Sequence, residues 1–350
     1  MMRHDELLFA TLTVLVAVVA AATVTGLVRR FVLARGMIDV PNARSSHVEP
    51  TARGGGLAIV TVVLAGVSWS WVRGEMEAPL ALGLILGGGM VAGIGLLDDL
   101  GHVPAPRRLL VHVIALGGAL AGVGGLPEVQ WGSASVDLGL AGDMLAGLAC
   151  VWFLNLFNFM DGIDGIAASE AAWIAFAAAG LASATDAPRA LVSVWLLIGA
   201  ASLGFLTWNW PPARIFMGDV GSGFLGFALA LLLVYSTGCS GLTVWTAIIL
   251  ASPFIADASV TLVVRVTRGE RWYSAHRSHA YQRLSRQWRS HARVTGLFLA
   301  INMVLVLPAA WVSVFRPELG PGIALALLLA LGGAARAAGA GRAEPTGDAS

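Results

Sequence analysis

Lysine is absent from this chain of 350 residues, and all 22 basic residues are arginines. Without lysine the chain cannot form a Schiff base or a Walker-type phosphate loop, so both kinds of site are excluded. Cysteine is almost absent too. Cys150 and Cys239 lie in or beside apolar runs, where a small buried side chain is a better interpretation than a disulfide or a metal pair.

Charge is also scarce, at 12% of residues against roughly 25% in soluble proteins, whereas 57% of residues are hydrophobic and the mean hydropathy is +0.77. Apolar segments follow one another along the whole chain, which leaves no room for a sizeable soluble domain. The sequence therefore predicts an all-α polytopic membrane protein. A single transmembrane domain would cover residues 1–338, and residues 339–350, which lack an apolar period, would form a disordered tail.

Apolar windows of about 17 to 25 residues predict eleven transmembrane helices. They cover residues 7–28, 55–72, 80–97, 108–126, 142–159, 166–183, 189–207, 222–236, 241–264, 295–314 and 320–338. The first window is too long for the apolar core of a signal peptide, so we expect it to remain as a helix.

The arginines test this assignment, because cytoplasmic loops of membrane proteins carry an excess of positive residues. If the eleven helices alternate in direction, 18 of the 22 arginines fall on one face and four on the other. The amino terminus is therefore expected outside and the carboxyl terminus in the cytoplasm. A wrong number of helices would have mixed the two sets.

Five aspartates fall on the predicted cytoplasmic face, at the ends of helices: Asp98, Asp99, Asp161, Asp164 and Asp219. An acid at a membrane edge is costly unless it is paired, solvated or metal-bound, so it suggests a functional site. Gathered carboxylates suit Mg²⁺, with Mn²⁺ as the alternative ion, when substrate phosphates complete the coordination. Solvated acids that end a helix are the other interpretation, above all for Asp98 and Asp99, which cannot point the same way on a helix.

Further polar side chains share that face. Asp219 lies among glycines, which allow backbone N–H groups to approach a phosphate. The histidines suit hydrogen bonding or proton transfer to phosphate, whereas the arginines are also explained by contact with anionic lipids. Two asparagines one turn apart could line the site or bond between helices. These candidates are Arg44, His47, Arg108, Asn155, Asn158, His276, Arg277 and His279.

Five motifs occur in order on this face. They are Asp39-Val-Pro-Asn-Ala-Arg44-Ser-Ser-His47, Gly95-Leu-Leu-Asp98-Asp99, Asn155-Leu-Phe-Asn158-Phe-Met-Asp161-Gly-Ile-Asp164-Gly165, Phe216-Met-Gly-Asp219-Val-Gly-Ser222 and His276-Arg-Ser-His279-Ala-Tyr-Gln282. With them the chain resembles the polyprenyl-phosphate N-acetylhexosamine-1-phosphate transferases, glycosyltransferase family 4. The last motif is similar to the O-antigen initiating branch. The chain departs from the family at Val40, where lysine is common, and has Arg108 as the basic residue after the double aspartate.

The resemblance implies an enzyme of the bacterial inner (plasma) membrane that transfers a sugar 1-phosphate from a UDP-N-acetylhexosamine to undecaprenyl phosphate. UMP would be released, Mg²⁺ would be needed, and the active site would face the cytoplasm. The reaction would begin O-antigen or another cell-envelope polysaccharide, by direct displacement or, alternatively, through a phospho-aspartate.

The resemblance also implies roles for the candidate residues. The implied catalytic residues are Asp98, Asp99, Asp219 and His279. The implied substrate-binding residues are Arg44, His47, Arg108, Asn155, Asn158, Asp161, Asp164, His276 and Arg277. The implied metal ligands are Asp99, Asp161 and Asp219.

A membrane transporter or flippase is the competing function class. Acids at mid-membrane along several helices would support it, and Asp257 is the one clear example inside a predicted helix. The sequence leaves open whether the sugar is N-acetylglucosamine, N-acetylfucosamine or N-acetylquinovosamine, because few side chains can distinguish them. A homodimer is one alternative for the oligomeric state, and no nucleic acid partner is expected.

Overall fold

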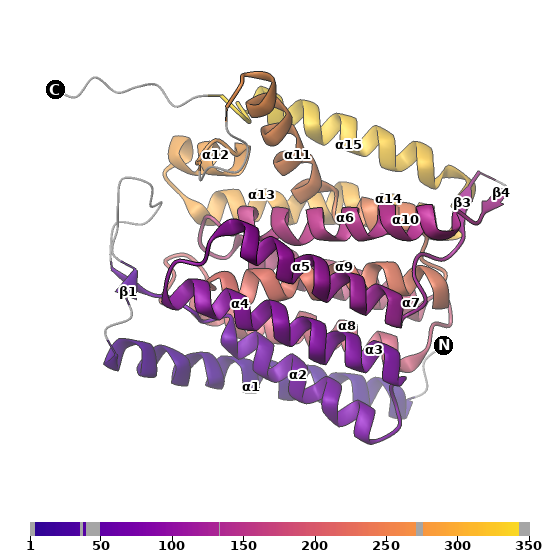
Figure 1. The fold of residues 1–350 in the computed structure, drawn as a ribbon, viewed down its shortest axis with the longest axis horizontal. Coiled ribbons are helices and arrows are strands. Elements are labelled where there is room, and N and C mark those ends of the chain that lie inside the picture. The colour runs from indigo at the N-terminus through magenta and orange to yellow at the C-terminus, as the bar shows by residue number, and fades with distance from the viewer. Residues whose placement is uncertain (1–3, 36–37, 40–49, 133, 271–275, 343–350) are drawn as a thin grey trace.

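The computed structural model describes residues 4–35, 38–39, 50–132, 134–270 and 276–342. Long helices run back and forth along one direction (Figure 1). The helices are α1 (His4–Ala34), α2 (Leu57–Val72), α3 (Ala78–Leu82), α4 (Gly88–Leu100), α5 (Ala105–Gly122), α6 (Gly139–Met160), α7 (Ile166–Ser183), α8 (Arg189–Asn209), α9 (Asp219–Cys239), α10 (Val244–Leu250), α11 (Ser252–Thr267), α12 (Ala280–Trp288), α13 (His291–Ile301), α14 (Leu307–Phe315) and α15 (Gly320–Ala337).

Shorter elements complete the chain. Two π-helical turns, η1 (Gly83–Gly87) and η2 (Asn302–Val306), join α3 to α4 and α13 to α14, and a 3₁₀ turn, η3 (Pro317–Leu319), precedes α15. Two small antiparallel hairpins were not expected in an all-α chain. They are formed by β1 (Ile38–Asp39) with β2 (Thr51–Ala52), and by β3 (Val129–Trp131) with β4 (Ala134–Val136).

The membrane-crossing character of the fold is confirmed. Among the described residues, eight continuous helical segments are long and apolar enough to cross a membrane, or nine if the bent pair of α10 and α11 counts as one. The other two predicted spans correspond to α2, a shorter apolar helix of 16 residues, and to α5, whose first turn carries Arg107 and Arg108. The count of eleven and the side on which each terminus lies stay predictions.

The prediction of one straight helix over residues 241–264 was wrong. The chain bends by 76° between α10 and α11, and Pro253 lies in the first turn of α11. Proline has no backbone N–H and its ring clashes with the carbonyl four residues earlier, so a helix breaks just before it. After the bend, α11 packs against α15.

Glycines bring the motif-bearing helix ends together around α9. Gly95 of α4 lies against the backbone of Asp219, and Gly56 lies against Gly221 of α9, so a Cβ atom at either glycine would overlap main-chain atoms. Helix α6 packs along another side of α9. The carboxyl ends of α4 and α6 and the amino end of α9 therefore meet at one end of the bundle.

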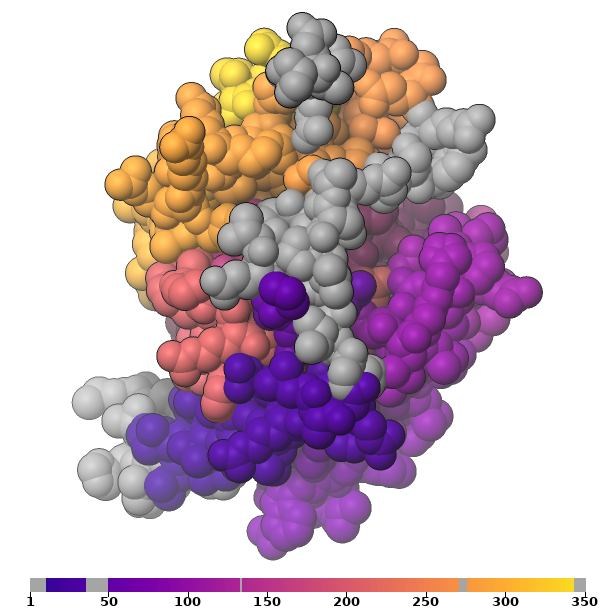
Figure 2. All heavy atoms as spheres, turned by 90° about the vertical axis from the view of Figure 1, so that its left-hand side faces the viewer, coloured from indigo at the N-terminus to yellow at the C-terminus, as the bar shows by residue number. Residues whose placement is uncertain are grey.

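Figure 2 views that end of the molecule. Segments far apart in the sequence meet there, from the indigo amino-terminal part to the orange and yellow carboxyl-terminal part. Residues 339–342 of the predicted tail belong to this end and are packed, with Ala340 fully buried, because they close the last turn of α15. The rest of the predicted tail lies outside the described residues.

Candidate active site

Three aspartates and two arginines form one ion-pair cluster at this end of the bundle. Asp219 lies at its centre: its Oδ1 is 3.1 Å from Nη2 of Arg53, and its Oδ2 is 2.6 Å from Nη1 of Arg108. The same Nη1 of Arg108 is 2.6 Å from Oδ2 of Asp98. Nε of Arg53 is 2.8 Å from Oδ1 of Asp99. The two adjacent aspartates of α4 point to different arginines, and both arginines reach Asp219.

Asp99 holds the start of α9. Its Oδ1 accepts a hydrogen bond from the backbone N–H of Asp219 at 2.9 Å, and its Oδ2 accepts one from Val220 at 3.1 Å. The first N–H groups of a helix have no partner within the helix, and a carboxylate satisfies them while matching the helix dipole. The side chain of Asp99 is only 3% exposed. Asp99 therefore positions Asp219 directly.

Asp98 is more accessible than its neighbour. Its side chain is 12% exposed, and its Oδ1 accepts a hydrogen bond from the backbone N–H of Val103 at 2.8 Å. This bond fixes the turn between α4 and α5. Arg108 reaches the cluster from the first turn of α5. Asp98 therefore remains oriented while part of its carboxylate faces the space outside the bundle.

Asp161 follows the last turn of α6 and is partly buried. Burial raises its pKa to about 7, the negative charges of Asp219 and Asp99 act in the same direction, and Arg53 opposes them. The carboxyl group of Asp161 is thus an acid whose charge the surrounding arginines do not fully balance.

Asp164 ties three segments together. Its Oδ2 accepts a hydrogen bond from the backbone N–H of Ala213 at 3.0 Å and lies 3.3 Å from Nδ1 of His291. Its backbone carbonyl accepts one from the Thr295 hydroxyl. The loop after α6 is therefore fastened to the segment before α9 and to the start of α13.

The two predicted asparagines differ in what they contact. Nδ2 of Asn158 donates to the hydroxyl of Ser222 on α9 at 2.9 Å, so this side chain joins two helices beside the cluster. Nδ2 of Asn155 donates to the carbonyl of Val151 in its own helix. Of the two, Asn158 is the one that helps to hold α6 against α9.

The histidine motif forms a second group, before α12. His276 and His279 are stacked with ring centroids 4.9 Å apart, and Nδ1 of His279 is 3.5 Å from Oδ1 of Asp257. Asp257 also accepts hydrogen bonds from the backbone N–H groups of Ala280 and Tyr281, each at 2.9 Å. The carboxylate of Asp257 is therefore used to start α12, so the acid on which the transporter alternative rested has a structural role.

Burial lowers the pKa of His276 to about 3. The neighbouring His279 and Arg265 contribute in the same direction, and Asp257 opposes them. Nδ1 of His276 lies 3.0 Å from the hydroxyl of Ser278. His276 is therefore neutral at physiological pH and suited to accept or donate a hydrogen bond without carrying charge.

Tyr281 connects the histidine group to the loop after α6. Its hydroxyl donates to the carbonyl of Phe159 at 2.8 Å, and a Cβ at Gly162 would overlap that hydroxyl. The histidine segment and the Asp161–Gly165 loop are therefore packed against each other. The carbonyl of Arg277 accepts a hydrogen bond from Arg286.

Some predicted residues cannot be placed, and some important ones were not predicted. Arg44 and His47 lie outside the described residues. Arg53 was not among the predicted site residues. Its position just before three glycines was a usable signal, because Gly55 and Gly56 donate hydrogen bonds to the carbonyls of Phe216 and Met217, next to Asp219. His291 belongs to none of the five motifs, so nothing in the sequence marked it as a site residue.

The carboxylates of this site fit a divalent cation whose coordination is completed by the substrate. Three carboxylates, those of Asp98, Asp99 and Asp219, pair with the guanidinium groups of Arg53 and Arg108, and the carboxyl group of Asp161 adds a fourth acid to these two cations. No group of three acidic, histidine or cysteine side chains among the described residues forms a ready metal cage. Mg²⁺ does not require one, because it commonly uses one or two carboxylates with waters and substrate phosphates.

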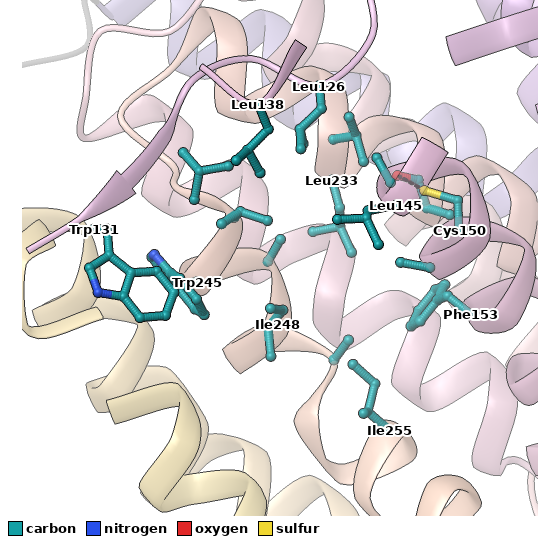
Figure 3. Close-up of a pocket in the computed structure, with 18 of the residues that line it drawn as sticks. Leu126, Trp131, Leu138, Leu145, Cys150, Phe153, Leu233, Trp245, Ile248 and Ile255 are labelled. Atoms are coloured by element: carbon teal, nitrogen blue, oxygen red, sulfur yellow. Dashed lines mark hydrogen bonds between the residues drawn. The ribbon is translucent and has the colours of Figure 1, made fainter. Parts of the chain in front are cut away.

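The opposite end of the bundle has a different character. An apolar pocket of about 460 Å³ lies there between the β3–β4 hairpin, α6, α9 and α10. Figure 3 shows Trp131 and Trp245 on one side of it and Cys150 and Phe153 on the other. The residues that line it carry no charged group.

Comparisons with known proteins identify a family for the chain. A family model described as glycosyl transferase family 4 matches residues 81–237, the range that includes Asp98, Asp161 and Asp219. The chain is 30% identical to the decaprenyl-phosphate N-acetylglucosaminephosphotransferase of Mycobacterium tuberculosis, over 87% of this chain and 82% of that protein.

Two other relatives have related names. The chain is 29% identical to the probable undecaprenyl-phosphate N-acetylglucosaminyl 1-phosphate transferase of Bacillus subtilis, over 90% of each chain. It is 34% identical to the phospho-N-acetylmuramoyl-pentapeptide-transferase of Moorella thermoacetica, over 56% of this chain and 64% of that protein.

Proposed function

This chain belongs to the polyprenyl-phosphate sugar 1-phosphate transferases of glycosyl transferase family 4, and we propose that it transfers N-acetylhexosamine 1-phosphate from a UDP-sugar to undecaprenyl phosphate, releasing UMP. The observation that supports this activity most directly is the cluster of Asp98, Asp99 and Asp219 with two arginines at one end of a membrane bundle. Transfer of a phosphoryl group depends mainly on alignment and on neutralisation of charge. The cluster offers groups for both tasks.

The donor diphosphate would bind at Asp219 and Asp161. These two carboxylates are the ones best suited to hold Mg²⁺, because both oxygens of Asp99 already accept hydrogen bonds from the start of α9. When bound, the ion supplies neutralisation and polarisation of phosphate oxygens. Arg53 and Arg108 would turn from the carboxylates towards the diphosphate. Asp99 would keep Asp219 in place while the two arginines turn.

The acceptor phosphate would approach Asp98, which is the more exposed of the two adjacent acids. Asp98 would orient the lipid phosphate or remove its proton, so that one phosphate oxygen attacks the donor directly. The end of a membrane bundle suits this meeting, since the acceptor is anchored in lipid and the donor is soluble. The arginine asymmetry favours the cytoplasmic face of the bacterial inner membrane.

N-Acetylglucosamine is the proposed sugar, because the relatives from Mycobacterium tuberculosis and Bacillus subtilis are named for it. Asp164, Asn158 and the histidine segment would surround the nucleotide and the leaving UMP. The product would be the first lipid-linked intermediate of O-antigen or of another cell-envelope polysaccharide.

The test uses purified protein in nanodiscs with undecaprenyl phosphate, Mg²⁺ and UDP-N-acetylhexosamines, with UMP release as the measured quantity. Asp219→Asn is expected to reduce kcat/KM by roughly 10²- to 10³-fold, because the variant loses charge at the centre of the cluster. Asp137→Asn, which alters an exposed acid near the β3–β4 hairpin, is the matched control and should retain full activity.

Three outcomes decide the proposal. UMP release that requires both lipid and Mg²⁺ supports it and identifies the sugar. UMP release over many turnovers without the lipid acceptor, or equal activity in Asp219→Asn, overturns it. Capture of a labelled phospho-enzyme in the absence of the lipid would replace direct displacement with a two-step route.

A further inference from the structure

The five residues after α15, 338–342, pack back onto the protein and are called the C-terminal strap below. They lie beside α11 and the segment that precedes α12. Ala340 is fully buried and packs with Ala280 and Ala335 in a small apolar cluster. A run rich in alanine and glycine would be expected to remain loose, so a specific arrangement must hold it.

The strap begins with a defined helix stop. Gly339 has φ +95°, its N–H donates to the carbonyl of Arg336, and the N–H of Ala340 donates to the carbonyl of Ala335. This pair of bonds is the Schellman arrangement, in which a left-handed glycine closes the helix and an apolar contact packs across it. The contact between Ala340 and Ala335 supplies that apolar packing.

From this stop the strap reaches the histidine segment. The N–H of Gly341 donates to the backbone carbonyl of Ser278 at 2.8 Å, and Nη1 of Arg268 donates to the carbonyl of Gly341 at 3.4 Å. Gly341 has φ +72°, and a Cβ there would overlap Val264. Glycine is therefore required by both the backbone angle and the lack of space.

Ser278 is the residue through which the strap acts. It lies between His276 and His279 in the chain, and its hydroxyl is 3.0 Å from Nδ1 of His276. Nη1 of Arg265 donates to the same hydroxyl at 3.5 Å. Ser278 is 5% exposed, so its backbone and side chain are both held. Moving the carbonyl of Ser278 would move both histidines.

We propose that the C-terminal strap is a positioning element for the histidine segment of the active site. Its anchor is the hydrogen bond from Gly341 to Ser278, and its effect is to keep the half-buried His276 stacked on the buried His279. The importance of this effect for catalysis rests on the proposed function, in which the histidine segment contacts the nucleotide.

The first test does not depend on catalysis. Two truncations are compared, one ending at Arg342 and one ending at Ala337, each carrying Ser278→Cys for labelling with a maleimide. The chain that keeps the strap should react slowly, and the chain without it roughly tenfold faster, because local opening exposes the thiol. The same truncations without Ser278→Cys measure the background from Cys150 and Cys239. Equal labelling rates in the two truncations would overturn the proposal.

The second test uses full-length protein and a matched pair of glycine variants. Gly341→Ala places a methyl group against Val264, whereas Gly333→Ala on α15 adds one where nothing lies within 4 Å. We expect Gly341→Ala to lose about tenfold in kcat/KM, the lower range for residues that orient a site residue. Gly333→Ala should remain unchanged. Equal activity of the two variants contradicts a positioning role.

A pH profile separates positioning from a general loss of structure. The charged and titratable groups that face His276 are His279, Arg265 and Asp257. In Gly341→Ala the exposed His276 should protonate near its ordinary pKa of about 6.5, which makes the rate fall more steeply with acid than in the wild type. A loss of rate that is uniform at all pH values would contradict the positioning role. If the wild type shows no transferase activity, the proposed function fails while the labelling result still decides the strap.

Discussion

Asp99 and Asp257 perform the same structural task in two parts of the molecule. Each carboxylate accepts hydrogen bonds from the first two N–H groups of a helix that follows elsewhere in the chain, α9 for Asp99 and α12 for Asp257. In both cases the helix start carries chemistry: Asp219 is the first residue of α9, and His279 immediately precedes α12.

The two sites differ in what balances the carboxylate. Asp99 has Arg53 at 2.8 Å, a cation at every accessible pH. Asp257 has the Thr261 hydroxyl at 3.2 Å and His279 at 3.5 Å. A buried acid in a membrane helix therefore does not by itself indicate ion transport, because its hydrogen-bond partners decide its role. Asp99 holds the start of α9 beside an arginine, whereas Asp257 holds the start of α12 beside an imidazole.

Replacing both acids by asparagine should produce the largest contrast. An amide retains one acceptor oxygen but turns an NH₂ group towards a helix N–H, so both variants weaken a helix start. Asp99→Asn also leaves Arg53 beside a neutral group. We expect kcat/KM to fall by about 100-fold in Asp99→Asn and by about tenfold in Asp257→Asn, the range found for groups that orient site residues.

UMP release under identical substrate and Mg²⁺ concentrations measures both variants. Equal losses would show that the helix start, and not the arginine, accounts for the effect. A larger loss in Asp257→Asn would reverse the roles assigned to the two acids.

A second variant tests how closely the start of α9 must pack against Asp99. Gly218, with φ +76°, lies so near Asp99 that an added Cβ would overlap its carboxylate. Gly218→Ala should cost about 1–3 kcal/mol in backbone strain, because φ +76° with ψ 170° is a conformation essentially restricted to glycine, and displacement of Asp99 should lower kcat/KM roughly tenfold. Gly101→Ala is the control, since Gly101 has φ −168° and open space around it. Thermal unfolding and UMP release are measured together, and an active, stable Gly218→Ala protein would contradict the close fit.

The smallest expected effect concerns His276, which lies in the part of the molecule that Asp257 holds together. His276 has a folded pKa of about 3, below its ordinary value, because it is buried. Between about pH 6.5 and 3 the unfolded chain binds the additional proton, so stability falls as the pH falls. From pH 7.5 to 5.5 His276 should contribute a loss of about 1 kcal/mol relative to His276→Gln, allowing for solvent screening at a partly exposed ring. The raised pKa of Asp161, about 7, acts in the opposite direction and equally in both proteins, so the difference between them isolates His276.

Denaturant unfolding in detergent at those two pH values measures this loss. His276→Gln should remove this contribution, and His102→Gln, which alters an exposed histidine, should retain it. A pH dependence of His276→Gln equal to that of the wild type would assign the loss to another group.

Helix positions were largely predictable because apolar runs are a local signal. The window 166–183 coincides with α7, and 142–159 falls within α6. The bend before Pro253 was missed since apolar residues continue on both sides of it. The ordered strap was missed because glycine and alanine have little side chain to indicate packing, although the glycine after α15 is a common helix stop.

The sequence by itself determined the membrane architecture, the family and the five aspartates, because hydropathy and motifs are properties of short segments. Only the tertiary structure decided what each acid does. Asp98 and Asp99 are neighbours, yet one faces Arg108 and the other caps a helix that begins 120 residues later. Such roles depend on distances of a few ångströms between segments far apart in the chain, and those distances follow from how the helices pack.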